Sequence, residues 1–265
     1  MTRSGPRPRA IVLTFDNLGE ASAMQRGTWT GDIPLGQDPS VTTALPWLLD
    51  ELDGCGLTAT FFVEAVNCEI NPQAVREIAA RGHEVGVHGW SHEPWAALEA
   101  ATELELLERS TRAFAELGIT TSGFRPPGGA GTAQTTDLLR RLGYRWYSPA
   151  GDSPTVRGGL ASIPFDWELV DAYHLMASFG ELRRQRGDRA DPLSPDVVIG
   201  RMGDAIARHV QETQTVILHP FLMLDGLWAA GARQLLAQIG ELTHDARAWT
   251  VPGRRYAAWL SRDGA

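Results

Sequence analysis

Polar residues with reactive side chains recur along this chain directly after short apolar runs. The first run, Ile11–Phe15, is followed by Asp16, and a late run, Thr215–Leu218, is followed by His219. Apolar runs of this length that are rich in β-branched and aromatic residues predict buried strands. Because the active-site residues of strand–helix barrels gather at the carboxyl ends of the strands, we expect the side chains that follow these runs to lie close together.

Segments with helical periodicity separate the predicted strands. Leu45, Leu48, Leu49 and Leu52, for example, fall on one helical face. The predicted strands are 10–15, 58–63, 84–87, 122–124, 144–147, 160–165 and 215–218, and the predicted helices are 41–52, 71–82, 98–117, 132–142, 195–213 and 227–242. Such alternation is typical of parallel strands joined by right-handed crossovers. We therefore predict an α/β fold in which about seven parallel strands form a distorted (β/α) barrel.

The alternation continues without a repeat or an obvious linker. We therefore expect a single domain over residues 1–265, with its motifs between residues 10 and 220. Two stretches, 18–40 and 171–194, are long for connections between neighbouring elements. Since long connections are commonly functional, we interpret both as candidate lids over the site.

The composition limits the class of partner. The chain has a formal net charge of −8, with 43% hydrophobic and 21% charged residues, which predicts a globular protein with a substantial core. The negative charge argues against nucleic acid and against an anionic membrane, because both bind basic surfaces. No long apolar segment follows the basic residues 1–9, so we expect no signal peptide or membrane anchor and a cytoplasmic location. A homo-oligomer is compatible with the sequence.

The motif residues suggest one kind of chemistry when they are taken together. His88 and His92 can converge on one ion if the chain turns directly after the strand. Alone, such a pair is common by chance, and Asp16, Arg125 or His219 alone could be a helix cap, a turn residue or a core residue. Their shared place at strand ends is more specific, and it predicts metal-assisted hydrolysis.

In chain order, the motifs resemble those of a known family. Thr-Phe-Asp-Asn ending at Asn17, His88-Gly-Trp-Ser-His92, Arg-Pro-Pro-Gly ending at Gly128, Asp166-Trp167 and Leu218-His219-Pro220 resemble the five motifs of the polysaccharide deacetylases (the nodulation-type domain, carbohydrate esterase family 4). The resemblance implies hydrolysis of a carbon–nitrogen amide bond, by deacetylation of an amino sugar or of a small N-acylated metabolite. The expected partner is thus a small-molecule or oligosaccharide substrate.

The resemblance also implies catalytic roles. Asp16 would be the catalytic base, and Arg125 would hold and orient it. His219 would be the general acid that protonates the leaving amine, with its pKa tuned by Asp166. The backbone N–H of Gly128 would help to bind the oxyanion.

The same resemblance implies a metal site with one departure. His88 and His92 would bind a divalent metal, expected to be zinc, and Asn17 stands where the family usually has an aspartate as the third ligand. An amide oxygen brings no charge, and zinc prefers anionic or imidazole donors. We therefore expect weakened metal binding unless another carboxylate helps, and Glu20 is near in sequence.

Two alternatives follow from Asn17. One is a weakly metal-dependent or metal-independent hydrolase of cyclic amides or ureides, of the allantoinase type, to which the histidine motifs are also similar. The other is a non-catalytic carbohydrate-binding barrel.

Aromatic and apolar residues beside the motifs are candidates for substrate contacts. The resemblance implies that Trp167 and Leu218 wall the pocket for the acyl group. Trp90 and Tyr173 are further candidates, although large aromatic residues also commonly fill the core.

Overall fold

A mainly parallel sheet forms the centre of the molecule. The computed structural model describes residues 9–208 and 213–263, and within them the sheet has nine strands, in the order β6-β7-β5-β4-β3-β2-β1-β8 with β9 paired to β1. The strands are β1 (Ala10–Asp16), β2 (Thr60–Val63), β3 (Glu84–Val87), β4 (Gly123–Phe124), β5 (Trp146–Tyr147), β6 (Thr155–Arg157), β7 (Leu160–Ser162), β8 (Thr213–Leu218) and β9 (Trp249–Thr250).

The strand pairing confirms the predicted α/β fold. The seven strands from β7 to β8 along this order pair in parallel, and β6 adds an antiparallel hairpin to β7. Beyond β7 the chain makes isolated parallel bridges, Ala150 to Phe165 and Val170 to Ile217. The second bridge brings the chain after β7 back to β8, so the sheet curves round into a distorted barrel.

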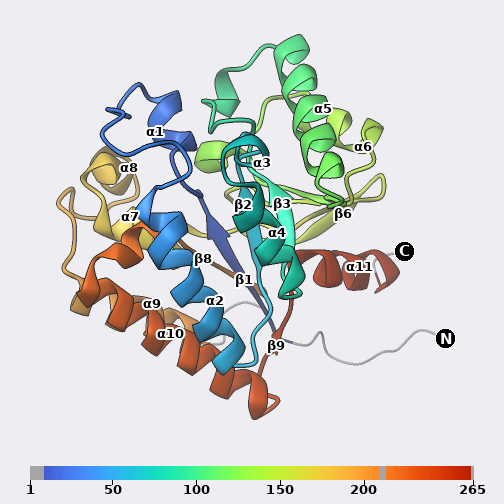
Figure 1. The fold of residues 1–265 in the computed structure, drawn as a ribbon. Helices are drawn as coiled ribbons and strands as arrows, with labels where there is room; N and C mark the ends of the chain where they lie inside the picture. Colours follow the sequence, from blue (N-terminus) through green and yellow to red (C-terminus); the bar gives the residue numbers. More distant parts are fainter. Residues whose placement is uncertain (1–8, 209–212, 264–265) are drawn as a thin grey trace.

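Helices cover the outside of the sheet. The longer ones are α2 (Leu45–Gly54), α4 (Pro72–Ala80), α5 (Ala100–Glu116), α6 (Thr135–Arg141), α9 (Pro195–Ala207), α10 (Gly226–His244) and α11 (Gly253–Asp263). Figure 1 shows α5 and α6 on one side of the sheet and α9 and α10 on the other. The shorter elements are α1 (Ala21–Gln25), η1 (Ser40–Ala44), α3 (Asn67–Ile70), η2 (Trp95–Ala97), η3 (Pro127–Gly129), η4 (Trp167–Leu169), α7 (Asp171–Leu175), η5 (Ala177–Phe179), α8 (Gly180–Gln185) and η6 (Pro220–Leu224).

Alternation along the strands decides which side chains face the barrel interior. In β1, Ile11, Leu13 and Phe15 belong to the large core beneath the outer helices. Val12 instead joins a second cluster with Phe62 and with residues of α11. The even-numbered residues of β1 and β2 therefore face the barrel interior. In β1 the last of them is Asp16, at the carboxyl end of the strand.

The lower half of the barrel interior is filled by side chains. Trp146 is fully buried in the second cluster, beside Tyr256 and Leu260 of α11. A Cβ at Gly253 would lie 2.1 Å from the Trp146 ring, so only glycine allows this approach. Because α11 closes this end, substrate access is restricted to the carboxyl ends of the strands.

One predicted helix, 195–213, and one predicted strand, 215–218, have different bounds in the structure. The helix expected over 195–213 ends at Ala207, and β8 begins at Thr213; residues 209–212 lie outside the described part of the chain, as do residues 1–8. In the described residues, no helix combines the length and the apolar character needed to cross a bilayer.

Candidate active site

Asp16 is held in place by an extensively bonded arginine. Nη1 of Arg125 donates to Oδ1 of Asp16 at 2.6 Å and to Oγ1 of Thr14 at 2.8 Å, while Nη2 donates to Oγ of Ser148 at 2.8 Å. All four side chains are buried. Burial lowers the pKa of Arg125, and the charge of Asp16 opposes that effect. The guanidinium therefore fixes the Asp16 carboxylate, whose Oδ2 lies 4.0 Å from Nε2 of His88.

His88 and His92 have the protonation state that metal ligands need. Nδ1 of His88 donates to the Arg125 carbonyl oxygen at 2.8 Å, which leaves the lone pair of Nε2 free. Burial lowers the pKa of His88 to about 3. The pKa of His92 is also lowered to about 3, mainly by burial and secondly by the neighbouring His88. The ring centroids lie 5.1 Å apart. Both imidazoles are therefore neutral near pH 7.

The turn that carries His92 is held in a strained conformation. His92 has a φ of 76°, and Asn17, across the cavity, has a φ of 63°. The Glu93 carboxylate accepts the backbone N–H groups of Trp90 at 3.0 Å and Ser91 at 2.9 Å. Left-handed backbone at residues other than glycine is costly and is concentrated at functional sites. Glu93 thus supports the geometry of the histidine motif.

A third potential ligand, Glu64, comes from the end of β2. Its side chain is fully buried; Oε2 accepts the Leu18 N–H at 3.1 Å, and Oε1 has no hydrogen-bond partner in the described structure. Burial raises the pKa of Glu64 to about 8. One ligand atom from each of Glu64, His88 and His92 lies within 4.8 Å of the other two. Two imidazoles and one carboxylate are a donor set that fits zinc.

Glu20 does not reach this cluster. Its Oε1 accepts the Gly36 N–H at 2.7 Å, and its Oε2 accepts Nδ2 of Asn71 at 3.2 Å. The suggestion that Glu20 substitutes for a ligand at position 17 must therefore be corrected, because its carboxylate fixes the segment 18–40. Asn17 does line the cavity, and its role as a ligand stays a prediction.

The expected partner of His219 must also be corrected. Nδ1 of His219 donates to Oδ1 of Asp171 at 2.5 Å, and the His219 backbone N–H donates to Oδ2 at 2.8 Å. Asp171 is fully buried. Burial lowers the pKa of His219, but the charge of Asp171 and the hydrogen bond to it more than offset burial, so the pKa is raised. Asp171, not Asp166, favours the protonated imidazole.

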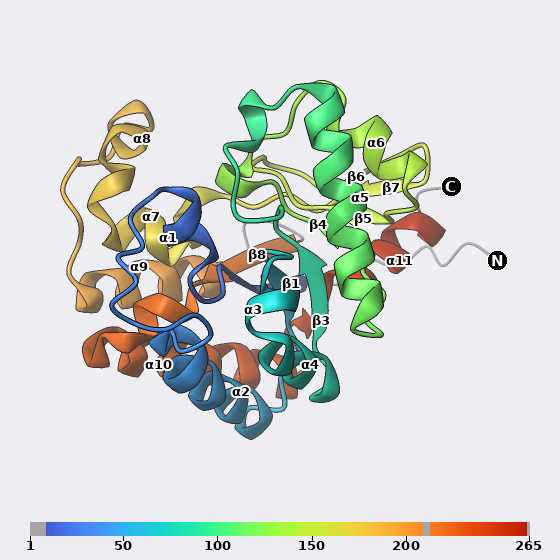
Figure 2. The same ribbon diagram turned by 45° about the horizontal axis from the view of Figure 1, so that its top comes forward.

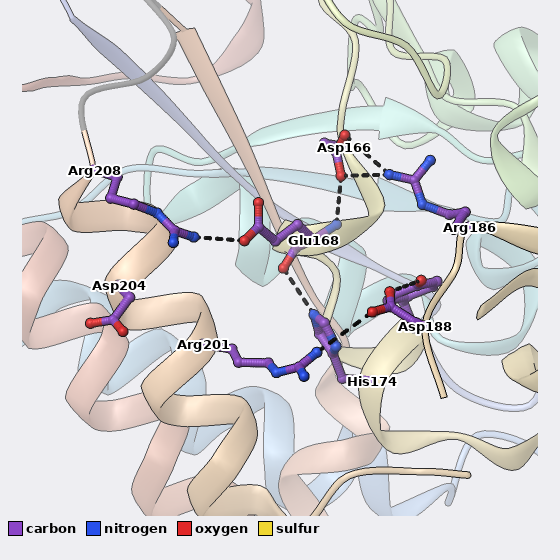
Figure 3. A pocket seen from close by; sticks show the side chains of 9 residues that line it. Asp166, Glu168, His174, Arg186, Asp188, Arg201, Asp204 and Arg208 are labelled. Carbon is purple, nitrogen blue, oxygen red and sulfur yellow. Dashed lines mark hydrogen bonds and ion pairs between the residues drawn. The ribbon is translucent and has the colours of Figure 1, made fainter. Parts of the chain in front are cut away.

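Asp166 lies in a separate pocket of charged residues. Its carboxylate accepts the Glu168 N–H at 2.7 Å, which caps η4, and forms an ion pair with Arg186 at 3.1 Å. Figure 3 shows this pairing, together with the pairing of Glu168 with Arg208 and of Arg201 with Asp188. The Asp166 carboxylate is thus engaged by η4 and Arg186, as is usual for an N-cap side chain, while Nδ1 of His219 is bonded to Asp171.

The candidate catalytic residues line one cavity of about 410 Å³. Its polar wall contains Asp16, Asn17, His88, His92, Arg125 and His219. Its apolar wall contains Phe165, Trp167, Met176, Phe179, Ile217 and Phe221. Gly128 also lines it, with a φ of 76° that favours glycine.

Both long connections contribute to the cavity. Ser22 and Arg26 come from 18–40, and Ala172 and Ser178 come from 171–194. Figures 1 and 2 show α1 and α7, one from each connection, side by side.

Three expected substrate contacts lie outside this cavity. Leu218 is fully buried in the outer core, because strand alternation directs Ile217 and not Leu218 inward. The Trp90 ring is covered by the Arg109 guanidinium at 3.5 Å. The Tyr173 hydroxyl donates to Asp188 at 2.5 Å and belongs to the charged pocket. Of the expected aromatic and apolar contacts, Trp167 faces the cavity.

The sequence analysis missed Glu64 and Asp171. Glu64 had a local signal, since it follows a predicted strand just as His88 does. Asp171 had none, because its position depends on the bridge between Val170 and Ile217.

Comparison with known proteins identifies similar sequences and folds. Residues 3–147 match the family model for polysaccharide deacetylase. A peptidoglycan deacetylase of Helicobacter pylori is 27% identical over 184 residues, which are 58% of this chain and 59% of that protein. The chain thus spans less than two thirds of this relative.

Solved structures show the same fold. One is a Mycobacterium smegmatis protein assigned to the polysaccharide deacetylases, with a TM-score of 0.83, 24% identity and coverage of 99% of this chain and 94% of that chain. Another is the allantoinase Puue, with a TM-score of 0.74, 15% identity and coverage of 96% and 90%.

Proposed function

Because this chain belongs to the polysaccharide deacetylase family, a class of hydrolases acting on carbon–nitrogen bonds, we propose that it removes an acyl group from an N-acylated substrate with the help of a divalent metal. One observation carries the proposal. A fixed carboxylate, Asp16, and a histidine paired with a buried carboxylate, His219, line the same cavity as two neutral imidazoles. A protein that only bound a ligand would have no need for an acid and a base arranged in this way.

His88 and His92 are the residues that would hold the metal, with a carboxylate to complete the set. A divalent cation there would polarise the amide carbonyl and lower the pKa of a water molecule. Asp16 accepts the proton of the attacking water, since Arg125 occupies Oδ1 and leaves Oδ2 directed toward His88. The strand end and the arginine together prevent the carboxylate from rotating away.

His219 supplies the proton that the leaving nitrogen needs. An amine cannot leave as an anion, so amide cleavage requires a general acid. With Nδ1 bonded to Asp171, the His219 ring can donate from Nε2. The raised pKa keeps this ring protonated over a wider pH range.

The cavity favours a compact substrate. A volume of about 410 Å³ suits a single N-acylated amino sugar or a metabolite of similar size, with the acyl group against the wall of Trp167 and Phe179. We also propose that residues 1–265 form one domain and that the segments 18–40 and 171–194 act as lids over the cavity.

The test is turnover on a panel of N-acetyl amino sugars, N-acyl metabolites and cyclic ureides. Wild type and His219→Ala are assayed side by side, with activated esters as a second class of substrate. We expect loss of about 10²–10⁴-fold on amides and a much smaller loss on esters, whose leaving groups need little protonation.

The alternatives give different results in the same assay. Turnover of ureides alone, unaffected by chelators, would indicate an allantoinase-type hydrolase. Binding of N-acetyl sugars without turnover of any substrate, in protein loaded with metal, would indicate a binding barrel and refute the proposal.

A further inference from the structure

We infer that Glu64 is the anionic metal ligand of this chain and that it supplies the charge that Asn17 lacks. The inference rests on the proposed metal-assisted function, and it names the residue that completes the metal site. Asn17 lines the cavity but carries no charge, whereas Glu64 lies with both histidines within 4.8 Å.

The register of the sheet places Glu64 beside His88. Val63 of β2 pairs with Val87 of β3, and the His88 N–H donates to the Val63 carbonyl at 3.0 Å. Glu64 and His88 therefore follow neighbouring parallel strands at the same level. Alternation directs both inward, since Phe62 and Gly86, two residues earlier, face each other inside the barrel.

The carboxyl group of Glu64 has an unused oxygen in a place where burial disfavours its charged form. Its Oε1 has no partner among the described residues, and buried polar atoms without partners are rare in native proteins. The Arg125 guanidinium, which carries the positive charge of the polar wall beside the histidines, is bonded to Asp16, Thr14 and Ser148. The charges of Asp16 and Glu93 add to the effect of burial in raising the pKa of Glu64.

A purely structural role does not account for Glu64. Its Oε2 anchors the Leu18 N–H, but Asn67 Nδ2 also holds this segment by donating to the Leu18 carbonyl at 3.0 Å. An amide at position 64 would accept the Leu18 N–H equally well. What an amide would lack is the negative charge and the second carboxylate oxygen.

Glu64→Gln tests the inference, because it keeps the shape and removes the charge. The metal-free proteins are titrated with Zn²⁺ by calorimetry, and with Co²⁺ by visible absorption, in the absence of substrate. We expect zinc affinity to fall by at least about 100-fold, and Asn17→Asp in the Glu64→Gln protein to recover part of it. Both Asn and Asp tolerate the left-handed backbone of position 17. The matched control is Glu20→Gln, a buried carboxylate that is already hydrogen-bonded, which should change affinity less than about 2-fold.

Wild-type affinity in a folded Glu64→Gln protein would overturn the inference. If that variant does not fold, as judged by circular dichroism, a crystal structure of the zinc-loaded wild-type protein decides instead. Oε1 or Oε2 of Glu64 should lie ~2.0–2.2 Å from the zinc, and a separation above about 3 Å would overturn the inference. These measurements need no turnover, so they are independent of whether the proposed deacetylation is found.

Discussion

Replacing Asp171 by asparagine should lower the pKa of His219 and move the alkaline limit of activity to lower pH. Asp171 is fully buried and accepts Nδ1 of His219 at 2.5 Å. A hydrogen bond to a charged group contributes ~1.5–3 kcal/mol, and one pKa unit corresponds to ~1.4 kcal/mol. The change should therefore lower the pKa of His219, because its protonated form loses an interaction of about that size.

The sign follows from the raised pKa of His219. The general acid must be protonated, so a lower pKa removes the active form as pH rises. Above the new limit, kcat/KM on amides should fall by about 10–100-fold. The free energy of unfolding should also depend on pH. Because the pKa of His219 is higher in the folded than in the unfolded protein, its protonation stabilises the fold below the unfolded pKa of about 6.5. This contribution is lost as pH rises through the folded pKa. The loss of stability in the Asp171→Asn variant should thus be greatest near pH 5–6.

The assay is the pH profile of kcat/KM, together with an NMR titration of the His219 ring. Asp166→Asn is the matched control, since Asp166 has an exposed ion pair with Arg186, and such pairs contribute ~0–1 kcal/mol. That variant should leave the alkaline limit in place. Equal effects of the two substitutions, or an unchanged His219 pKa in Asp171→Asn, would refute the assignment of Asp171.

Three further predictions follow from the placement of the other residues. Asp16→Asn should reduce turnover by about 10²–10⁴-fold with bound metal, measured by elemental analysis, unchanged; loss of the metal would make Asp16 a ligand and not a base. Trp167→Ala should raise KM, whereas Trp90→Ala, whose ring is covered by Arg109, should lower the melting temperature without raising KM; the reverse result would reverse their assignments. Leu218→Ala should destabilise the protein by about 2–5 kcal/mol in urea denaturation with little effect on KM, and a large KM effect would show that this side chain reaches the substrate.

The strands and most of the motif residues could be predicted from the sequence because their signals are local. The predicted strand 84–87 coincides with β3, and the residue after it, His88, faces inward as a direct consequence of alternation. The contact between Arg125 and Asp16 is different, because 109 residues separate them. Only the resemblance to a family suggested that pairing.

Asp166 and Asp171 show why the rest was not predictable. Both follow apolar residues, and they stand at the starts of short helical segments: Asp166 precedes η4, and Asp171 is the first residue of α7. Which of them reaches His219 depends on η4, which turns the chain between them, and on the Val170 bridge to Ile217. Neither feature has a signature in the sequence, because a single turn of helix and a single bridge depend on tertiary packing.

Glu64 was not predicted for another reason: it lies far from position 17 in the sequence, whereas Glu20 lies near it. In a parallel barrel the relevant neighbour is the residue at the same level on the next strand, so position 64 is close to position 88 in space although 24 residues separate them. The residues directly after β1, β2, β3, β4 and β8 are Asn17, Glu64, His88, Arg125 and His219. Asn17 stands at the same kind of position, with a φ of 63° that asparagine tolerates, but its side chain carries no charge. A carboxylate at position 64 would therefore keep an anion in the site, on the neighbouring strand end beside His88.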